Sequence, residues 1–258
     1  MRRVRLGNTS LVVSRLAFGA ALLGHLQAQL TPEQAGPILK RAFELGVTFW
    51  DTADFYGTHA HVREGLRGLD RRQIVLVTKT RARTEEAAAA DIPRFLEELG
   101  TDYLDVVHLH GVDSPQGFKA RRGALKALLR AREEGLIRVA GLSTHSVATA
   151  RILPELLGEG IEVALIVQNK TGHNLAGGTV QEMEAAAQRA FARGMGLYSM
   201  KVFGQRKALV DHTPEELLAH NLALPYLHSL VVGMISVAEV EQNVEIVERL
   251  DPHQPAQS

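Results

Sequence analysis

Eight short apolar runs alternate with helical segments along nearly the whole of this chain of 258 residues. The runs predict strands at residues 16–20, 47–50, 73–78, 104–109, 137–142, 163–168, 196–200 and 229–233. Between them, start signals such as Thr31-Pro-Glu-Gln and Ser236-x-x-Glu239 indicate helices. Two further helices are predicted at 118–134 and 146–157, and Pro93 suggests a kink or a restart in the helix that Thr84 opens. Such an alternation over about 250 residues is typical of a parallel (β/α)8 TIM barrel.

The beginning and the end of the chain depart from this alternation. The opening RRVRLGNTSLVV predicts an N-terminal β-hairpin that turns around Gly7-Asn8. No linker interrupts the pattern, so residues 1–250 are expected to form a single barrel domain. The last residues, 251–258, read DPHQPAQS and are predicted to be a disordered tail.

Composition excludes several classes of function. The formal net charge is zero, so no nucleic acid or other polyanionic partner is expected. The sequence shows neither a long apolar stretch nor a signal peptide, which predicts a cytoplasmic protein away from the membrane. Cysteine is absent. Disulfides, thiolate metal sites, iron–sulfur clusters and cysteine nucleophiles are excluded together.

Three ionisable residues, Asp51, Lys79 and His110, each stand at the end of an apolar run. They follow one another at intervals of 28 and 31 residues, roughly the length of one βα unit. Neighbouring parallel strands lie about 5 Å apart. If the runs are adjacent strands, the three side chains converge at the carboxyl end of the barrel, with Tyr56 close by. Barrel enzymes carry their chemistry at that end.

The segment DTADFYG at residues 51–57 resembles the aldo-keto reductases, NAD(P)H-dependent barrel enzymes that reduce carbonyl groups. The resemblance extends over nearly the whole chain, from RLGNTSLVVSRLAFGA to GMISVAEVEQN. It implies that Asp51, Tyr56, Lys79 (in LVTKT) and His110 (in DYLDVVHLH) are the family's four catalytic residues. It also implies a small-molecule carbonyl substrate and reduction of an aldehyde or ketone to an alcohol.

The chemistry of these four residue types agrees with that reaction. A tyrosine hydroxyl is a weak acid with a pKa of about 10, and a cation about 4–6 Å away favours its phenolate. Lys79 can supply the cation, and Asp51 can neutralise a buried Lys79. His110 can donate a hydrogen bond to the substrate oxygen. The nicotinamide provides the hydride.

The resemblance also implies a cofactor site, with some departures from the family pattern. Ser143 and Gln168 match residues that hold the nicotinamide carboxamide, whereas Thr144 stands where the family has Asn. Tyr198 or Met200 takes the place of the aromatic residue that stacks on the nicotinamide. The other expected contacts come from Lys201 near the pyrophosphate and from Gln242 and Asn243 on the adenosine side.

The choice between NADP(H) and NAD(H) stays open at the sequence level. Many family members hold the 2′-phosphate of NADP with two cations, and the corresponding positions here are Gly233 and Glu239. Neither residue is cationic, and Glu239 also fits as the third residue of a capping box. Arg206 or Lys207, after the seventh barrel strand, can substitute. No metal is expected in this site.

Two other classes of function remain as alternatives. One is a non-catalytic protein that senses a nicotinamide cofactor on the same barrel, since a fold does not fix a function. The other is a metal-dependent barrel hydrolase, suggested by His59-x-His61 and His108-x-His110. The first strand, LAFGA, lacks the HxH motif expected of that superfamily. The sequence fixes neither the physiological substrate nor the oligomeric state.

Overall fold

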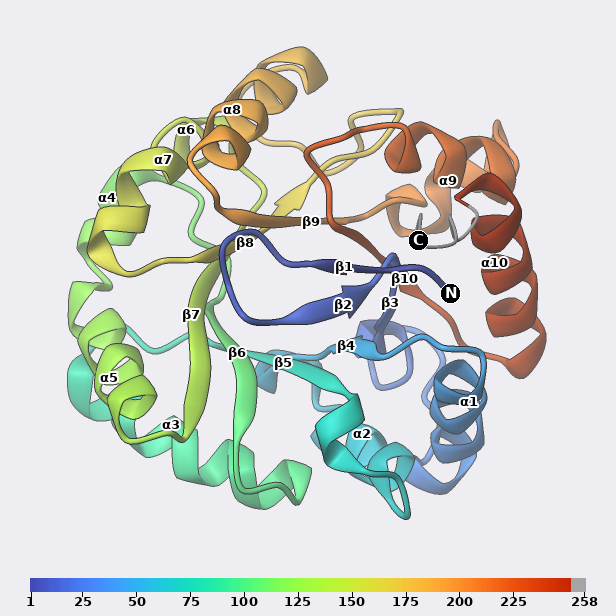
Figure 1. Cartoon of the computed structure of the whole chain (residues 1–258), viewed down its shortest axis with the longest axis horizontal. Coiled ribbons are helices and arrows are strands. Elements are labelled where there is room, and N and C mark those ends of the chain that lie inside the picture. Colours follow the sequence, from blue (N-terminus) through green and yellow to red (C-terminus); the bar gives the residue numbers. More distant parts are fainter. Residues whose placement is uncertain (252–258) are drawn as a thin grey trace, which may run out of the picture.

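The computed structural model describes residues 1–251. Within them, eight parallel strands close into a barrel in the order β10-β3-β4-β5-β6-β7-β8-β9 (Figure 1). These strands are β3 (Leu16–Gly19), β4 (Phe49–Asp51), β5 (Val75–Thr80), β6 (Leu104–Leu109), β7 (Ile137–Thr144), β8 (Val163–Val167), β9 (Gly196–Met200) and β10 (Ser229–Gly233). The predicted (β/α)8 barrel is therefore confirmed.

Helices form a ring outside the barrel, as Figure 1 shows. The longer ones are α1 (Pro32–Glu44), α2 (His59–Leu66), α3 (Glu85–Leu99), α5 (Arg122–Glu133), α8 (Val180–Ala192), α9 (Pro214–Leu222) and α10 (Val237–Leu250). The short ones are α4 (Pro115–Lys119), α6 (Val147–Ala150) and α7 (Leu153–Leu156). Short 3-10 segments are η1 (Ala20–Leu22), η2 (Asp54–Tyr56), η3 (Arg71–Gln73), η4 (Leu157–Glu159) and η5 (Gly204–Val210). None of the helices in residues 1–251 is long and apolar enough to cross a membrane.

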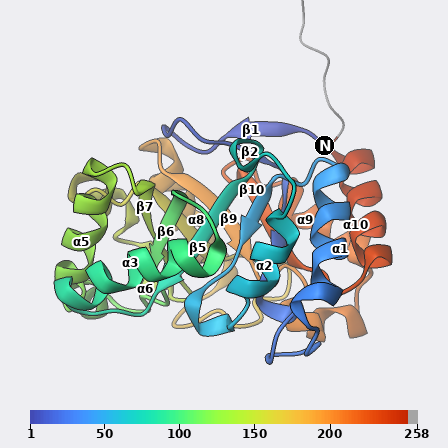
Figure 2. The same cartoon turned by 90° about the horizontal axis from the view of Figure 1, so that it is seen from below.

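The N-terminal hairpin closes one end of the barrel. It pairs β1 (Arg3–Arg5) with β2 (Val12–Ser14) in antiparallel register, and Figure 2 shows it lying along one end of the barrel. Leu6 and Leu11 are buried in the same cluster as Val75 and Val163, the first residues of β5 and β8. The hairpin therefore covers the amino ends of the strands and leaves the carboxyl ends for a site.

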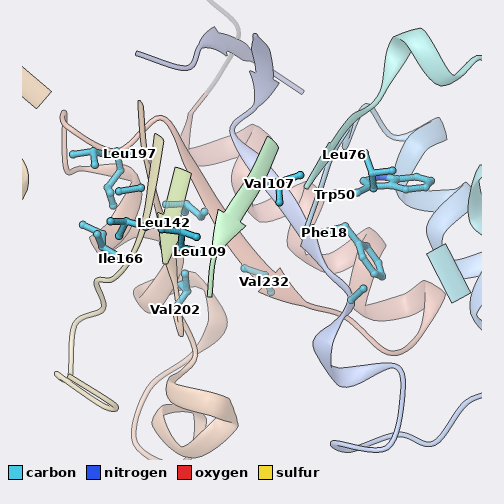
Figure 3. Packing of buried hydrophobic residues seen from close by; sticks show 14 of the residues in the cluster. Phe18, Trp50, Leu76, Val107, Leu109, Leu142, Ile166, Leu197, Val202 and Val232 are labelled. Atoms are coloured by element: carbon cyan, nitrogen blue, oxygen red, sulfur yellow. The ribbon is translucent and has the colours of Figure 1, made fainter. Parts of the chain in front are cut away.

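Side chains on the strands alternate between the barrel interior and the layer beneath the helices. In β4, Phe49 belongs to the inner cluster and Trp50 to the outer one. Figure 3 shows Trp50 and Leu76 grouped together in that outer cluster. The same alternation turns Asp51 and Lys79 inward, so the strand period itself directs charged groups into the barrel.

Several predicted boundaries differ from the structure. The predicted helix 118–134 is divided into α4 and α5, and the predicted helix 146–157 into α6 and α7. α7 has a proline in its first turn, where a missing N–H is harmless. No restart occurs at Pro93, because α3 runs unbroken through it.

The predicted tail begins at a residue that the structure places. Asp251 forms ion pairs with Arg15 at 2.7 Å and with Arg2 at 2.9 Å, which join the end of α10 to the beginning of the chain. Residues 252–258, the rest of the predicted disordered tail, lie outside the described residues.

Candidate active site

Asp51 and Lys79 form a buried ion pair at the carboxyl end of the barrel. The ammonium nitrogen of Lys79 lies 2.5 Å from Oδ1 of Asp51 and 2.7 Å from the carbonyl oxygen of Thr52. Lys79 is fully buried and Asp51 is nearly so. Adjacent strands β4 and β5 bring the two residues together. Burial raises the pKa of the Asp51 carboxyl, and the charge of Lys79 opposes that effect.

Tyr56 and His110 lie beside this ion pair. Tyr56 ends the 3-10 segment η2, and Gly57 then reverses the chain with a φ of 64°, a conformation that suits glycine. The Lys79 ammonium lies 5.1 Å from the centre of the Tyr56 ring. The rings of Tyr56 and His110 meet edge to face, with centroids 5.5 Å apart. The structure thus brings all four predicted residues together.

The protonation states of Tyr56 and His110 follow from burial. Burial raises the pKa of Tyr56 above its usual value, Lys79 acts in the opposite direction, and Asp51 raises it further. The lysine therefore acts as the sequence predicted, but desolvation outweighs it and Tyr56 keeps its proton at neutral pH. Burial, followed by the charge of Lys79, lowers the pKa of His110 to about 3, so this imidazole is neutral.

A tyrosine and a histidine extend the cluster into the barrel interior. The Tyr198 hydroxyl lies 2.6 Å from Nε2 of His108 and 3.0 Å from Oδ2 of Asp51. Both residues are fully buried. The sequence had offered Tyr198 as a residue stacking on the cofactor, but its ring is enclosed within the barrel. The alternation of side chains along a strand could have predicted the inward position of His108, because residues 108 and 110 point to the same side of β6.

A pocket opens next to the four residues, at the carboxyl ends of β3, β9 and β10. Asp51 and Tyr56 line it together with Met200 and Lys201. Of the two residues proposed to stack on a nicotinamide, Met200 therefore faces the pocket and Tyr198 does not. Lys201 is mostly buried, and burial together with the charge of Lys79 lowers its pKa.

The segment after β9 forms one wall of this pocket with an unusual backbone. Lys201, Gln205 and Arg206 have positive φ angles of 63°, 57° and 71°, a region that side chains rarely adopt. Arg206 pairs through Nη2 with Glu239, whose other oxygen accepts a hydrogen bond from the N–H of Ile235. The sequence had considered Arg206 and Glu239 separately, and only the fold shows that they form an ion pair.

The three residues expected to hold the carboxamide lie in different surroundings. Ser143 lies on the inner face of β7, and its hydroxyl oxygen accepts a hydrogen bond from the N–H of Gly111, next to His110. Thr144 donates instead to Asp113, at 3.3 Å. The structure does not bring Gln168 to the pocket, since its amide donates to Glu184 on α8. The last inner residues of β8 are Leu165, which lines the pocket, and Val167.

The two residues expected on the adenosine side differ in exposure. Gln242 is exposed on α10, whereas Asn243 is 4% exposed. Oδ1 of Asn243 is buried and has no hydrogen-bond partner among residues 1–251. An orphaned polar atom of this kind is uncommon in folded proteins and fits a site that binds a polar ligand.

His59 and His61, one of the two HxH pairs that suggested a metal hydrolase, form hydrogen bonds with other parts of the protein. His59 contacts Glu98 at 2.6 Å and Thr78 at 2.8 Å, and His61 contacts the carbonyl oxygen of Leu30. Among residues 1–251, no group of three or more His, Asp or Glu side chains is arranged to hold a metal ion. The geometry thus gives no support to the hydrolase alternative.

Comparison with known proteins identifies relatives over the whole barrel. A model of the aldo/keto reductase family matches residues 15–216. The L-galactose dehydrogenase of Arabidopsis thaliana is 25% identical over 286 residues, covering 95% of this chain and 88% of that protein. A probable aldo-keto reductase 1 of Glycine max is 32% identical over 163 residues, which cover 57% of this chain and 46% of that protein.

Solved structures share the fold. A putative aldo-keto reductase from Pseudomonas aeruginosa superimposes with a TM-score of 0.80 at 22% identity, covering 96% of this chain and 95% of that one. The holo form of an aldo-keto reductase from Bacillus halodurans gives 0.77 at 22% identity, covering 96% and 91%.

Proposed function

The chain belongs to the aldo/keto reductase family of oxidoreductases, and we propose that it reduces an aldehyde or ketone to an alcohol with NAD(P)H. One observation carries this proposal: Tyr56 lines the pocket, keeps its proton, and lies against both Lys79 and His110. A protonated acid, a neighbouring cation and a neutral hydrogen-bond donor are what carbonyl reduction requires of a protein.

Each of the four residues has a part in this proposal. Tyr56 donates its hydroxyl proton to the carbonyl oxygen of the substrate. Lys79 stabilises the phenolate that remains, and Asp51 keeps the charge of Lys79 compensated. His110 is neutral, so it carries a single ring N–H, which orients the carbonyl oxygen toward Tyr56.

We propose that a nicotinamide dinucleotide binds in and beside this pocket. Such a cofactor supplies the hydride when bound. Lys201 offers a cation to the phosphates, and Met200 offers an apolar surface to the nicotinamide. Nη1 of Arg206 and Oδ1 of Asn243 are buried and have no partner in the part of the chain that the structure describes, so both can bond to the adenosine half. Ser143 can donate its hydroxyl proton to the carboxamide, because its oxygen already accepts from Gly111.

The ion pair between Arg206 and Glu239 bears on cofactor choice. Arg206 is the arginine on this wall of the pocket that could bind the 2′-phosphate of NADP. Its charge is already neutralised by Glu239. We therefore propose weak discrimination between NADPH and NADH. An anionic phosphate has to compete with a carboxylate that is already in place.

The test is a panel of aldehydes and ketones assayed with NADPH and NADH in parallel. Consumption of the reduced nicotinamide measures turnover. Turnover of at least one carbonyl with either cofactor is expected. Tight binding of a cofactor without turnover of any carbonyl would instead support the cofactor-sensing alternative. Failure to bind either cofactor would contradict both proposals.

A further inference from the structure

We infer that the substrate carries a negatively charged group, a carboxylate or a phosphate, which binds to Arg81, Arg83 and Arg121 beside His110. The inference rests on the proposed carbonyl reduction and adds the chemical class of its substrate. We refer to these three residues as the arginine cluster.

Two members of the arginine cluster, Arg121 and Arg81, are tied to His110 and to its neighbour Phe55, and Arg83 follows Arg81 by two residues. Arg121 lies between α4 and α5 and donates a hydrogen bond from Nη1 to the carbonyl oxygen of His110. Arg81 follows β5, and its guanidinium carbon lies 4.6 Å from the centre of the Phe55 ring. Phe55 in turn meets His110 edge to face, at 6.4 Å between centroids. Arg121 is thus tied to the backbone of His110, and Arg81 packs on a ring that itself contacts the His110 ring.

These arginines differ from their neighbours in having no carboxylate partner. In residues 1–251, no Asp or Glu oxygen lies within 4.0 Å of a guanidinium nitrogen of Arg81, Arg83 or Arg121. By contrast, Arg122 pairs with Glu159 and Arg94 contacts three carboxylates. An empty anion-binding site is expected to contain several cations without counter-ions. The arginine cluster has this property and lies beside the proposed catalytic residues.

The positive charges act on one another. Burial, followed by the charges of Arg83 and Arg81, lowers the pKa of Arg121, which is partly buried. The charge of Asp113 acts in the opposite direction and raises the pKa of Arg121. The Asp113 carboxylate already accepts from the N–H of His145 at 2.7 Å and from Thr144 at 3.3 Å. An added anion would relieve the repulsion and give the guanidinium groups bidentate partners.

The position of the arginine cluster assigns this anion to the substrate and not to the cofactor. In the closed barrel, β5 and β6 stand opposite β9 and β10. The pocket proposed for the cofactor lies at β9, β10 and β3. The arginine cluster follows β5 and β6, across the mouth of the barrel. A carbonyl held between Tyr56 and His110 would therefore direct its other end toward these arginines.

The test compares three substrates of similar shape: 4-carboxybenzaldehyde, its methyl ester, and 4-formylphenyl phosphate. We expect kcat/KM for at least one of the two anions to exceed that of the ester about tenfold or more, as a charge-assisted arginine contact gives. Added salt should lower this preference, because the arginines are reached by solvent. The two anions also distinguish a carboxylate site from a phosphate site.

Three variants locate the effect. Arg121→Gln and Arg83→Gln should each reduce the ratio of anion to ester kcat/KM by several-fold, to about tenfold. The ratio is used because Arg121 also supports the backbone at His110, and a general loss of activity cancels in it. Arg83 forms no side-chain hydrogen bond within residues 1–251, so its replacement should not disturb folding. Arg189→Gln is the matched control, because Arg189 is exposed on α8 and has no ion-pair partner in the described part of the chain; it should leave the ratio unchanged.

The outcomes separate this inference from the proposed function. If the ester and other neutral aldehydes are reduced as well as the anions, the inference fails while carbonyl reduction stands. If no carbonyl is reduced, saturation-transfer NMR of 4-(hydroxymethyl)benzoate against benzyl alcohol still decides it. Stronger binding of the carboxylate, lost in Arg83→Gln and Arg121→Gln, supports an anion site. Equal binding overturns it.

Discussion

The Tyr198 hydroxyl donates a hydrogen bond of 3.0 Å to Oδ2 of Asp51. The other oxygen, Oδ1, accepts from Lys79, so each oxygen of this buried carboxylate has its own partner. Because the Tyr198 proton points to Asp51, Nε2 of His108 supplies the hydrogen between His108 and Tyr198. A chain of polar groups therefore extends from the barrel interior to the ion pair beside Tyr56.

Replacing Tyr198 with Phe should lower both stability and turnover. The change removes a hydrogen bond to a charged group and leaves a histidine N–H buried without a partner, at a cost of about 2–3 kcal/mol. Urea unfolding measures this cost. Tyr226→Phe is the matched control, since Tyr226 is also buried but its hydroxyl has no hydrogen-bond partner within residues 1–251. Equal stabilities for the two variants would show that the Tyr198 hydrogen bond contributes nothing.

Tyr56→Phe should abolish most reductase activity while keeping cofactor affinity. The ring stays in place against His110, but the proton that the reaction requires is lost. A positioned general acid contributes about 10²- to 10⁴-fold to a rate, so kcat should fall by that order. Stopped-flow or steady-state kinetics measure the rate, and nicotinamide fluorescence measures affinity. Activity within a few-fold of wild type would contradict the role of Tyr56 as proton donor.

Lys79→Met should reduce activity and stability together. It removes the cation beside Tyr56 and leaves Asp51 buried without compensation, which typically costs about 3–5 kcal/mol. The double variant Asp51→Asn, Lys79→Met should recover part of the stability and none of the activity, because the uncompensated charge is gone while the cation is still missing. Recovery of both would show that the ion pair is structural only.

Glu239→Gln should shift cofactor preference toward NADPH by about tenfold, the scale of one charge-assisted contact. The change frees Arg206, while the amide oxygen can still accept from Ile235. Glu241→Gln serves as the control, because Glu241 is exposed on the same helix and pairs with Arg41. Titration of both cofactors measures the ratio. A wild-type preference for NADPH above about a hundredfold would mean that other residues hold the phosphate.

The stability of the protein should fall in mild acid through His110. Its pKa is about 3 in the folded protein, against about 6.5 in the unfolded chain. The unfolded chain takes up the proton first, so this contribution is complete above pH 6.5 and is lost as the pH falls toward 3. Between pH 7 and pH 5 the loss from His110 is about 2 kcal/mol.

The variant His110→Gln isolates this contribution. It removes the titrating ring but leaves His108, which is also buried, in both proteins. Urea unfolding at the two pH values should show a smaller loss of stability for the variant than for the wild type. Parallel losses would show that His110 is protonated equally in the folded and unfolded states.

The sequence by itself was sufficient for the barrel and for the four clustered residues. Strand period and strand order explain this result. Eight apolar runs with helical connections permit few topologies, and a parallel barrel places every strand end at one face. Asp51, Lys79 and His110 needed only to stand at adjacent strand ends to converge. Local signals also predicted the helix starts at Thr31 and Ser236. The capping box at Thr31 is complete, but the box predicted at Ser236 is not formed, because the Glu239 carboxylate accepts from the N–H of Ile235 and pairs with Arg206.

Only the tertiary structure decided what these residues contact. The enclosure of Tyr198 beside Asp51, the pairing of Arg206 with Glu239 and the turn of Gln168 toward Glu184 join elements that are distant in the sequence. Such contacts depend on the directions of side chains and on their burial. Local sequence patterns predict neither of these properties. For the same reason the sequence foresaw that Lys79 would act on Tyr56, but not that burial would outweigh it.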